Sequence, residues 1–139
     1  YAPAYQTSGT PYVTSSADGE VSSTTAPIHI QFPSVTRFFE VTNVGSGDMR
    51  VGFTKNGILG AGASVSGSAS EKNAANSNYL VLSGTASTVR LEIKCTELYF
   101  LKNDAGTSNS AFSLVAGLTG ISRNQFPAVT GSAGYIGVG

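Results

Sequence analysis

The chain of 139 residues carries eight basic and eight acidic side chains, so its formal net charge at pH 7 is zero. A neutral chain with scattered Lys and Arg lacks the concentrated positive charge that binds a polyanion, which excludes an autonomous nucleic-acid-binding protein. The apolar runs are far shorter than the roughly 18 residues of a transmembrane helix, whereas the content of Leu, Ile, Val and Phe suits one folded domain.

Residues 1–27 are expected to form an extended N-terminal arm. The segment contains no Leu, Ile, Phe or Met, and ten of its residues are Ser or Thr. It has too little apolar surface to offset the entropy of ordering its own backbone, so we expect it to order against a neighbouring chain through its three tyrosines. It holds Asp18 and Glu20 but no Lys or Arg, so it is not a basic arm that binds a genome.

From Ile28 onward, short runs of β-branched and aromatic residues alternate with Gly, Ser and Asn at the spacing typical of antiparallel strands. No segment has the sustained apolar stripe of an amphipathic helix. The Gly- and Ser-rich stretch 56–77 is too long for a tight hairpin. The pattern predicts an all-β antiparallel sandwich over 28–139, with strands near 28–32, 36–43, 49–55, 79–83, 87–94, 97–102 and 111–118.

The clearest strand pattern lies in residues 88–95. Two sets of residues alternate there, Val89, Leu91, Ile93 and Cys95 on one face and Thr88, Arg90, Glu92 and Lys94 on the other. A period of two predicts that the first set is buried and the second exposed. The runs 79–82 and 98–101 are apolar on both faces, which favours central strands or strands covered by a partner subunit.

The residues that most often act as nucleophile, base or metal ligand are few and scattered. Cys95 continues a buried face, so we expect a small apolar core residue rather than a nucleophile. His29 is the only histidine, and it lies on the polar face of 28–32. One Cys and one His cannot build a structural zinc site. A single cysteine also excludes an intrachain disulfide, which favours a reducing compartment.

The carboxylates give no catalytic pair. Glu92 and Glu97 flank Cys95, but Glu92 alternates with basic residues on an exposed face, which favours solvated charge pairing. Asp48 lies in a Gly-rich turn, where Asp is favoured for local hydrogen bonding.

The loops give no ligand site. Residues 103–109 lack the spacing and the final Glu of a calcium loop. Residues 57–62 lack the Lys-Ser/Thr that ends a phosphate-binding loop, and the surroundings of Ser64 miss the nucleophile-elbow pattern. We therefore expect no catalytic residue, no cofactor and no metal ligand, and a protein that is not an enzyme.

Five sequence blocks follow one another over residues 40–139: VGSGDMRVGFT (44–54), NYLVL (78–82), RLEIKCTELYF (90–100), FSLVAGLTGI (112–121) and FPAVTGS (126–132). Their order resembles the vertex (penton) capsid proteins of large nucleocytoplasmic double-stranded DNA viruses, such as the chlorella-virus group. The blocks are structural and hold no catalytic signature.

This resemblance implies a single jelly roll of about eight strands, five copies of which plug each fivefold vertex of an icosahedral shell. It implies contacts with the surrounding major capsid protein and with minor capsid proteins, and an internal membrane between the shell and the DNA, so no direct contact with nucleic acid. It also implies assembly in the host cytoplasm and a final location in the virion.

A different class of protein stays open as an alternative: a carbohydrate- or receptor-binding β-sandwich of a phage tail or a cell surface. Such sites present exposed aromatic rings with polar neighbours, which Tyr79, Tyr99 and Tyr135 could supply. The chain has no Trp, the residue that would strengthen this interpretation.

Overall fold

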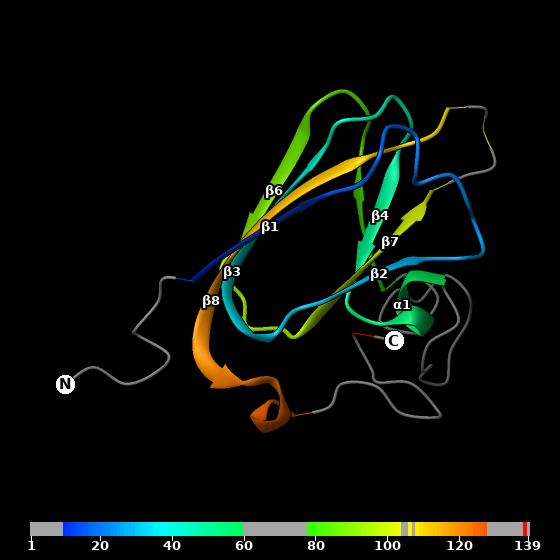
Figure 1. Ribbon diagram of the computed structural model, residues 1–139. Coiled ribbons are helices and arrows are strands. Elements are labelled where there is room, and N and C mark those ends of the chain that lie inside the picture. Colours follow the sequence, from blue (N-terminus) through cyan, green and yellow to red (C-terminus); the bar gives the residue numbers. More distant parts are fainter. Residues whose placement is uncertain (1–9, 60–77, 104–105, 107, 128–137, 139) are drawn as a thin grey trace.

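The computed structural model describes residues 10–59, 78–103, 106, 108–127 and 138. These residues form two antiparallel sheets that pack face to face (Figure 1). The strands are β1 (Thr10–Ser15), β2 (Ile28–Gln31), β3 (Ser34–Asn43), β4 (Met49–Gly52), β5 (Leu80–Leu82), β6 (Ser87–Leu91), β7 (Glu97–Lys102) and β8 (Phe112–Ser122). A short helix, α1 (Lys55–Leu59), follows β4, and a 3₁₀ turn, η1 (Arg123–Gln125), follows β8.

The strands pair in a nested order. The first sheet has the order β1-β8-β3-β6 and the second sheet the order β2-β7-β4-β5. Strand β1 therefore pairs with β8, β2 with β7, β3 with β6 and β4 with β5. This is one long hairpin of strand pairs rolled into two sheets, the arrangement of a jelly roll. The expected all-β jelly-roll sandwich is confirmed, and each of the seven expected strands has a counterpart.

The N-terminal boundary differs from the expectation. Residues 10–15 form β1, which pairs with β8 along its whole length. The ring of Tyr12 packs edge to face on Phe32 with 5.2 Å between ring centroids, and Val21 is buried. Residues 10–27 therefore belong to the sandwich, and only residues 1–9 of the expected arm lie outside the described residues. The sequence pattern missed β1 because β8 supplies the apolar contacts that the segment itself lacks.

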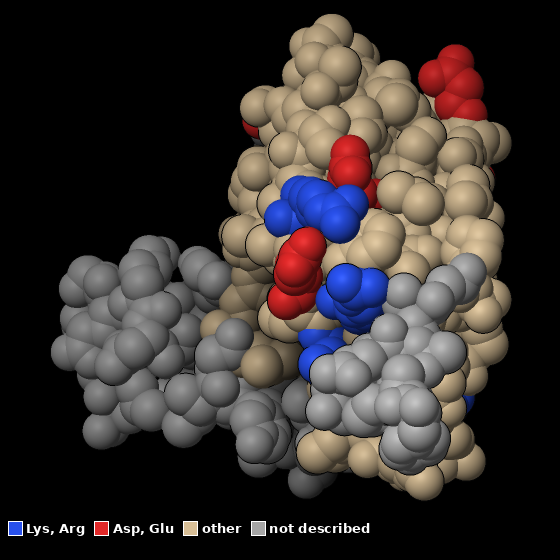
Figure 2. Space-filling view, turned by 90° about the vertical axis from the view of Figure 1, so that its left-hand side faces the viewer, with Lys and Arg blue, Asp and Glu red and all other residues tan. Residues whose placement is uncertain are grey.

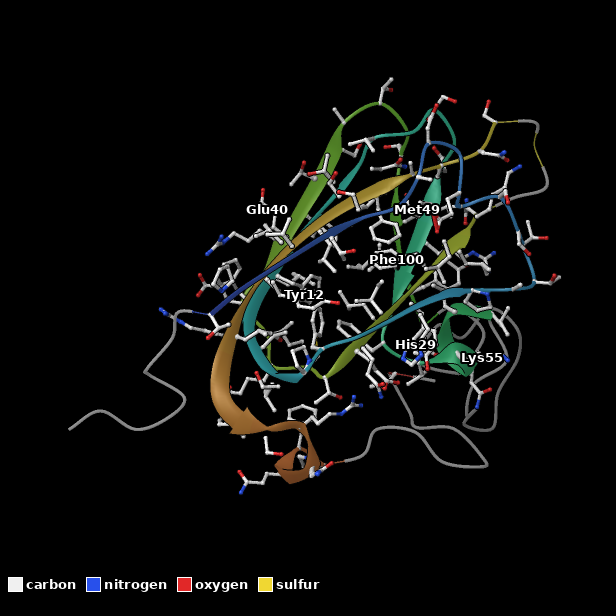
Figure 3. The ribbon with its side chains drawn as sticks, viewed as in Figure 1. Tyr12, His29, Glu40, Met49, Lys55 and Phe100 are labelled. Atoms are coloured by element: carbon white, nitrogen blue, oxygen red, sulfur yellow. The ribbon has the colours of Figure 1, made fainter. Side chains whose placement is uncertain are left out.

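The core lies between the sheets and consists of the inward side chains of both. Phe100 of β7 and Phe112 of β8 stack across it with 4.0 Å between centroids. Figure 3 shows Met49 and Phe100 pointing into this layer, with Tyr12 reaching it from β1. The largest fully buried side chains include Phe32, Phe39, Phe100, Phe112 and Met49.

The end of β4 was expected three residues later than the structure has it. The strand stops at Gly52, and α1, which the sequence did not predict, begins at Lys55. A Cβ atom at Gly52 would lie 3.1 Å from Cβ of Ile58, so the glycine lets α1 pack closely on the second sheet. α1 contacts β4 and β7.

The expected strand at 87–94 is also shorter, since β6 ends at Leu91. Ile93 was expected in the core and is 41% exposed, whereas Cys95 is buried as expected. After Leu91 the chain leaves the first sheet and crosses to the second, so the alternation no longer corresponds to the two faces of one sheet.

The two apolar runs behave differently. β7, which contains 98–101, is a central strand of its sheet. A central strand was one of the two expected arrangements, the other being a strand covered by a partner subunit. β5, which lies within 79–82, is an edge strand with Leu80 and Val81 exposed. A central position for this run was therefore wrong.

Candidate functional site

The segment 92–96, which carries the chain from β6 to β7, is fixed by one buried side chain. The hydroxyl of Thr36 donates to the carbonyl oxygen of Ile93 at 3.0 Å and accepts from the backbone N–H of Cys95 at 3.0 Å. The backbone N–H of Thr36 donates in turn to the carbonyl oxygen of Cys95 at 3.0 Å. Thr36 therefore determines where the two sheets are joined at this end.

An apolar cavity of about 240 Å³ lies beside this segment. Burial raises the pKa of the Cys95 thiol to about 11, so the thiol is neutral at pH 7. The thiolate is the nucleophilic form of cysteine, and burial therefore disfavours it at Cys95. The cavity is lined by Phe53, Ile93, Lys94, Cys95, Thr96, Glu97, Phe126 and Val138.

A polar cluster lies on the outer surface of the second sheet. His29 on β2 is directly opposite Tyr99 on β7, and their rings stack with 4.3 Å between centroids and 2° between planes. The Tyr99 hydroxyl donates to Oε1 of Glu97 at 3.2 Å, and Oε2 of Glu97 lies 3.6 Å from Nε2 of His29. Figure 3 shows His29 at this edge of the sandwich.

Burial, followed by the charge of Glu97, raises the pKa of Tyr99 to about 12. The phenol therefore stays protonated and donates a hydrogen bond to the carboxylate of Glu97. Both aromatic side chains are thus engaged with one carboxylate and with each other. The cluster resembles a satisfied surface network rather than an acid and a base aimed at a common substrate.

The remaining candidate residues do not come together. The carboxylate of Asp48 accepts from the backbone N–H of Gly84 at 3.1 Å. Gly84 lies between β5 and β6, so this bond is a contact between two loops and not the local hydrogen bond expected within the Asp48 turn. In the loop 103–109, several oxygen atoms bind side chains of the protein itself. Lys102 Nζ donates to the carbonyl oxygen of Gly106 and to Oδ1 of Asn109. The Arg50 guanidinium donates to both oxygen atoms of Asn103. Ser64 lies outside the described residues, as do residues 60–62 of the Gly-rich segment.

The tyrosines considered as sugar platforms are partly covered. The guanidinium carbon of Arg50 lies 4.2 Å from the centroid of the Tyr79 ring, and the Tyr99 ring stacks on His29. Tyr135 lies outside the described residues. Each described ring therefore has one face occupied by a side chain of the protein.

Charged side chains on the outer face of the first sheet gather into one mixed cluster, with mostly uncharged surface above it (Figure 2). Arg90 lies 3.7 Å from Glu40 and 3.5 Å from Glu92, and its guanidinium carbon is 4.0 Å from the centroid of the Phe38 ring. The expected pairing of Glu92 with Arg90 is confirmed. Such exposed pairs contribute about 0–1 kcal/mol each, so the cluster does little more than neutralise this face.

A row of hydroxyl groups crosses all four strands of the same face. Ser15, Ser113, Thr42 and Thr88 are successive cross-strand neighbours. Ser15 Oγ donates to Ser113 Oγ at 3.1 Å, and the hydroxyls of Thr42 and Thr88 lie 2.9 Å apart. This row adds uncharged polar groups to the face that also carries the Arg90 cluster.

The sequence patterns did not predict the roles of two buried polar residues, Thr36 and Asn43. Both are fully buried. Phe39, Val41 and Asn43 occupy successive inward positions of β3. The amide of Asn43 therefore interrupts an apolar face. That break in the alternation is the signal that could have identified it, because a buried amide needs hydrogen-bond partners.

Comparison of the chain with protein-family models, with curated proteins and with solved structures finds no match. Among the described residues, no three His, Cys, Asp or Glu side chains lie close enough together to hold a metal ion. No helix in the described part of the chain is long and apolar enough to cross a membrane.

Proposed function

We propose that this chain is a structural capsid protein that forms the pentameric vertex of an icosahedral double-stranded DNA virus shell. In this role five copies plug each fivefold vertex and contact the major capsid protein and minor capsid proteins. The subunit touches no nucleic acid, assembles in the host cytoplasm and resides in the virion.

The observation that carries this proposal is the nested pairing of β1 with β8, β2 with β7, β3 with β6 and β4 with β5. Eight strands in two such sheets make the jelly roll that viral capsid and lectin domains use. Since a fold alone does not determine a function, the surfaces and the five sequence blocks supply the rest of the support.

A ring that closes by rotation brings one flank of each subunit against the other flank of the next. Leu80 and Val81 on the edge strand β5 give one flank an exposed apolar patch, with 41% and 48% exposure. Few long charged side chains interrupt the surface, so little side-chain entropy and charge solvation is lost on contact. These properties favour a building block.

The test is the assembly state of the purified protein, examined by native mass spectrometry and by electron microscopy. We expect a species of five times the 14.2 kDa subunit mass and fivefold ring images. Leu80→Lys should weaken the ring by at least tenfold in concentration. Ile93→Lys is the matched control, because Ile93 is also 41% exposed but lies on the segment between the sheets.

Absence of fivefold rings over the accessible range of protein concentration contradicts the proposal. Binding of the soluble monomer to a glycan array, together with that absence, would replace it with the carbohydrate-binding alternative. The partly covered rings of Tyr79 and Tyr99 give that alternative no specific support.

A further inference from the structure

Strand β1 lies at the edge of the first sheet, so half of its backbone N–H and C=O groups face away from β8. The hydrogen bonds on the two sides of β8 show which residues these are. The backbone N–H of Ser16 donates to the carbonyl oxygen of Phe112 at 3.0 Å. On the other side of β8, the backbone N–H of Val44 donates to the carbonyl oxygen of Ala111 at 2.9 Å. Backbone direction alternates along a strand, so the even-numbered residues of β8 face β1 and the odd-numbered residues face β3.

The same alternation applies to β1. Thr10, Tyr12 and Thr14 direct their backbone groups to β8, whereas Pro11, Val13 and Ser15 direct theirs to the open edge. No described residue bonds the backbone groups of these three. Val13 is also the most exposed large apolar side chain of the described residues, at 72%. A backbone edge and an apolar side chain are therefore open at the same residue.

The two edge strands on this flank carry no charged side chain. β5 and β6 contact each other at one side of the sandwich, which places β1 and β2 together at the other. Neither β1 nor β2 contains Asp, Glu, Lys or Arg. Soluble proteins usually protect such edges with charged residues or bulges, because a free edge pairs with other strands. Here only Pro11 removes a donor.

We propose that β1 pairs antiparallel with β1 of a second copy about a twofold axis at Val13. In this register Val13 lies opposite Val13 of the other copy, and Pro11 lies opposite Ser15. Val13 N–H donates to the Val13 carbonyl oxygen across the axis, and Ser15 N–H donates to the Pro11 carbonyl oxygen. The missing N–H of Pro11 leaves no unpaired donor, so the edge is complementary to itself.

The charge of the flank favours the same partner. A twofold contact brings each side chain close to its own copy, so any charge on the axis would repel itself. The strand sequence TPYVTS carries none. Pairing would join the first sheets of both copies into one continuous sheet and bring the two exposed Val13 side chains into cross-strand contact.

This contact closes on two copies and cannot propagate into a ring. It describes the free subunit and does not rest on the proposed vertex function. The two assembly states differ in mass and in the residues that they need, so each test can fail separately.

Sedimentation velocity over a range of concentrations tests the proposal with the full chain. We expect a reversible monomer–dimer equilibrium that Val13→Lys weakens at least tenfold, because two ammonium groups meet at the axis. Val44→Lys is the matched control, since Val44 is 54% exposed in the turn between β3 and β4, and it should leave the dimer unchanged. Ser15→Pro removes the outward N–H and no backbone hydrogen bond to β8, although it also removes the hydroxyl contact of Ser15 with Ser113, and it should also weaken the dimer.

Amide hydrogen exchange gives a second readout within the wild-type protein. The Val13 and Ser15 amides should be protected in the dimer and should exchange rapidly after dilution, whereas the Thr14 amide should be protected in both states. A protein that is monomeric at all concentrations overturns the proposal. A dimer or a fivefold ring that Val13→Lys leaves intact, with no concentration-dependent protection of Val13, overturns it as well.

Discussion

Asn43 and Leu82 connect the two sheets by a direct hydrogen bond, in which the buried amide Nδ2 of Asn43 on β3 donates to the carbonyl oxygen of Leu82 on β5 at 3.0 Å. The same nitrogen donates to the carbonyl oxygen of Gly47 at 2.8 Å, and Oδ1 accepts from the N–H of Gly45 at 3.0 Å. One side chain thus holds the turn between β3 and β4 against the end of β5.

Replacing this amide should therefore be costly. Asn43→Ala removes the amide partner of the Leu82 carbonyl oxygen and of the Gly45 N–H, and leaves the Gly47 carbonyl oxygen with only the hydroxyl of Ser110. We expect a loss of about 2–4 kcal/mol in the free energy of unfolding. Urea denaturation measures it. Thr88→Ala, which removes an exposed hydroxyl pair with Thr42, is the control and should change stability by about 0.5 kcal/mol or less. Equal losses in both variants contradict the role of Asn43.

Thr36 provides a parallel test at the opposite sheet junction. Thr36→Val keeps the shape of the side chain but removes the hydroxyl that serves Ile93 and Cys95. We expect it to lower the free energy of unfolding by about 1–3 kcal/mol, whereas Thr36→Ser should keep most of the stability because it retains the hydroxyl. If the valine variant is as stable as the serine variant, the hydrogen bonds do not fix the crossing segment.

Gly117 and Phe38 are in close contact on the outer face of the first sheet, so we expect the effects of substituting them on stability to be coupled. A Cβ at Gly117 would lie 2.5 Å from Cε1 of Phe38, which is held between that glycine and Arg90. Gly117→Ala should cost about 1–3 kcal/mol through overpacking. In the Phe38→Ala background the same change should cost much less, because the clashing ring is gone. A double-mutant cycle by thermal or urea unfolding measures the coupling, and additive effects would contradict it.

The raised pKa of Cys95 predicts a loss of stability in alkali. The folded state holds the thiol pKa at about 11, against 9.0 for the free group, because burial disfavours the thiolate. Above pH 9 the unfolded chain ionises first and gains stability relative to the folded chain. The free energy of unfolding should fall between pH 9 and 11, by about 2–3 kcal/mol at most from this group.

Cys95→Ala isolates this contribution. Tyr99, whose pKa is raised to about 12, also lowers the free energy of unfolding as the pH rises, but at higher pH. It is present in both proteins, so its effect cancels in the difference between them. The difference in unfolding free energy between wild type and Cys95→Ala should therefore change between pH 8 and pH 10.5. A difference that is constant with pH would show that Cys95 does not titrate differently in the two states.

Much of the fold was predictable because a strand with one buried face has apolar residues at every second position of its sequence. Val89 and Leu91 alternate with polar and charged neighbours, and that pattern correctly predicted β6. The same logic failed at Ile93, since alternation reports a face only while the strand stays in its sheet. It also missed β1, because the burial of Tyr12 depends on Phe32, a residue that the local pattern does not contain.

The site residues were predictable mainly as isolated groups. Burial of Cys95 and the surface position of His29 followed from their strands. The engagement of Tyr99 with both Glu97 and His29 depends on the pairing of β2 with β7. The sheet-joining roles of Thr36 and Asn43 depend on contacts with distant parts of the chain, so no local pattern specifies them.

The nested strand order also has a consequence for synthesis. β1 is synthesised before the other strands that the structure describes, but its partner β8 is the last of them. Throughout translation, the N-terminal strand must therefore wait without its native neighbour. Pairing over such sequence separations makes folding slow and leaves unpaired strands exposed in the nascent chain. Once β8 has been made, it completes the first sheet by inserting between β1 and β3, so the ordering of β1 depends on a strand that is synthesised much later.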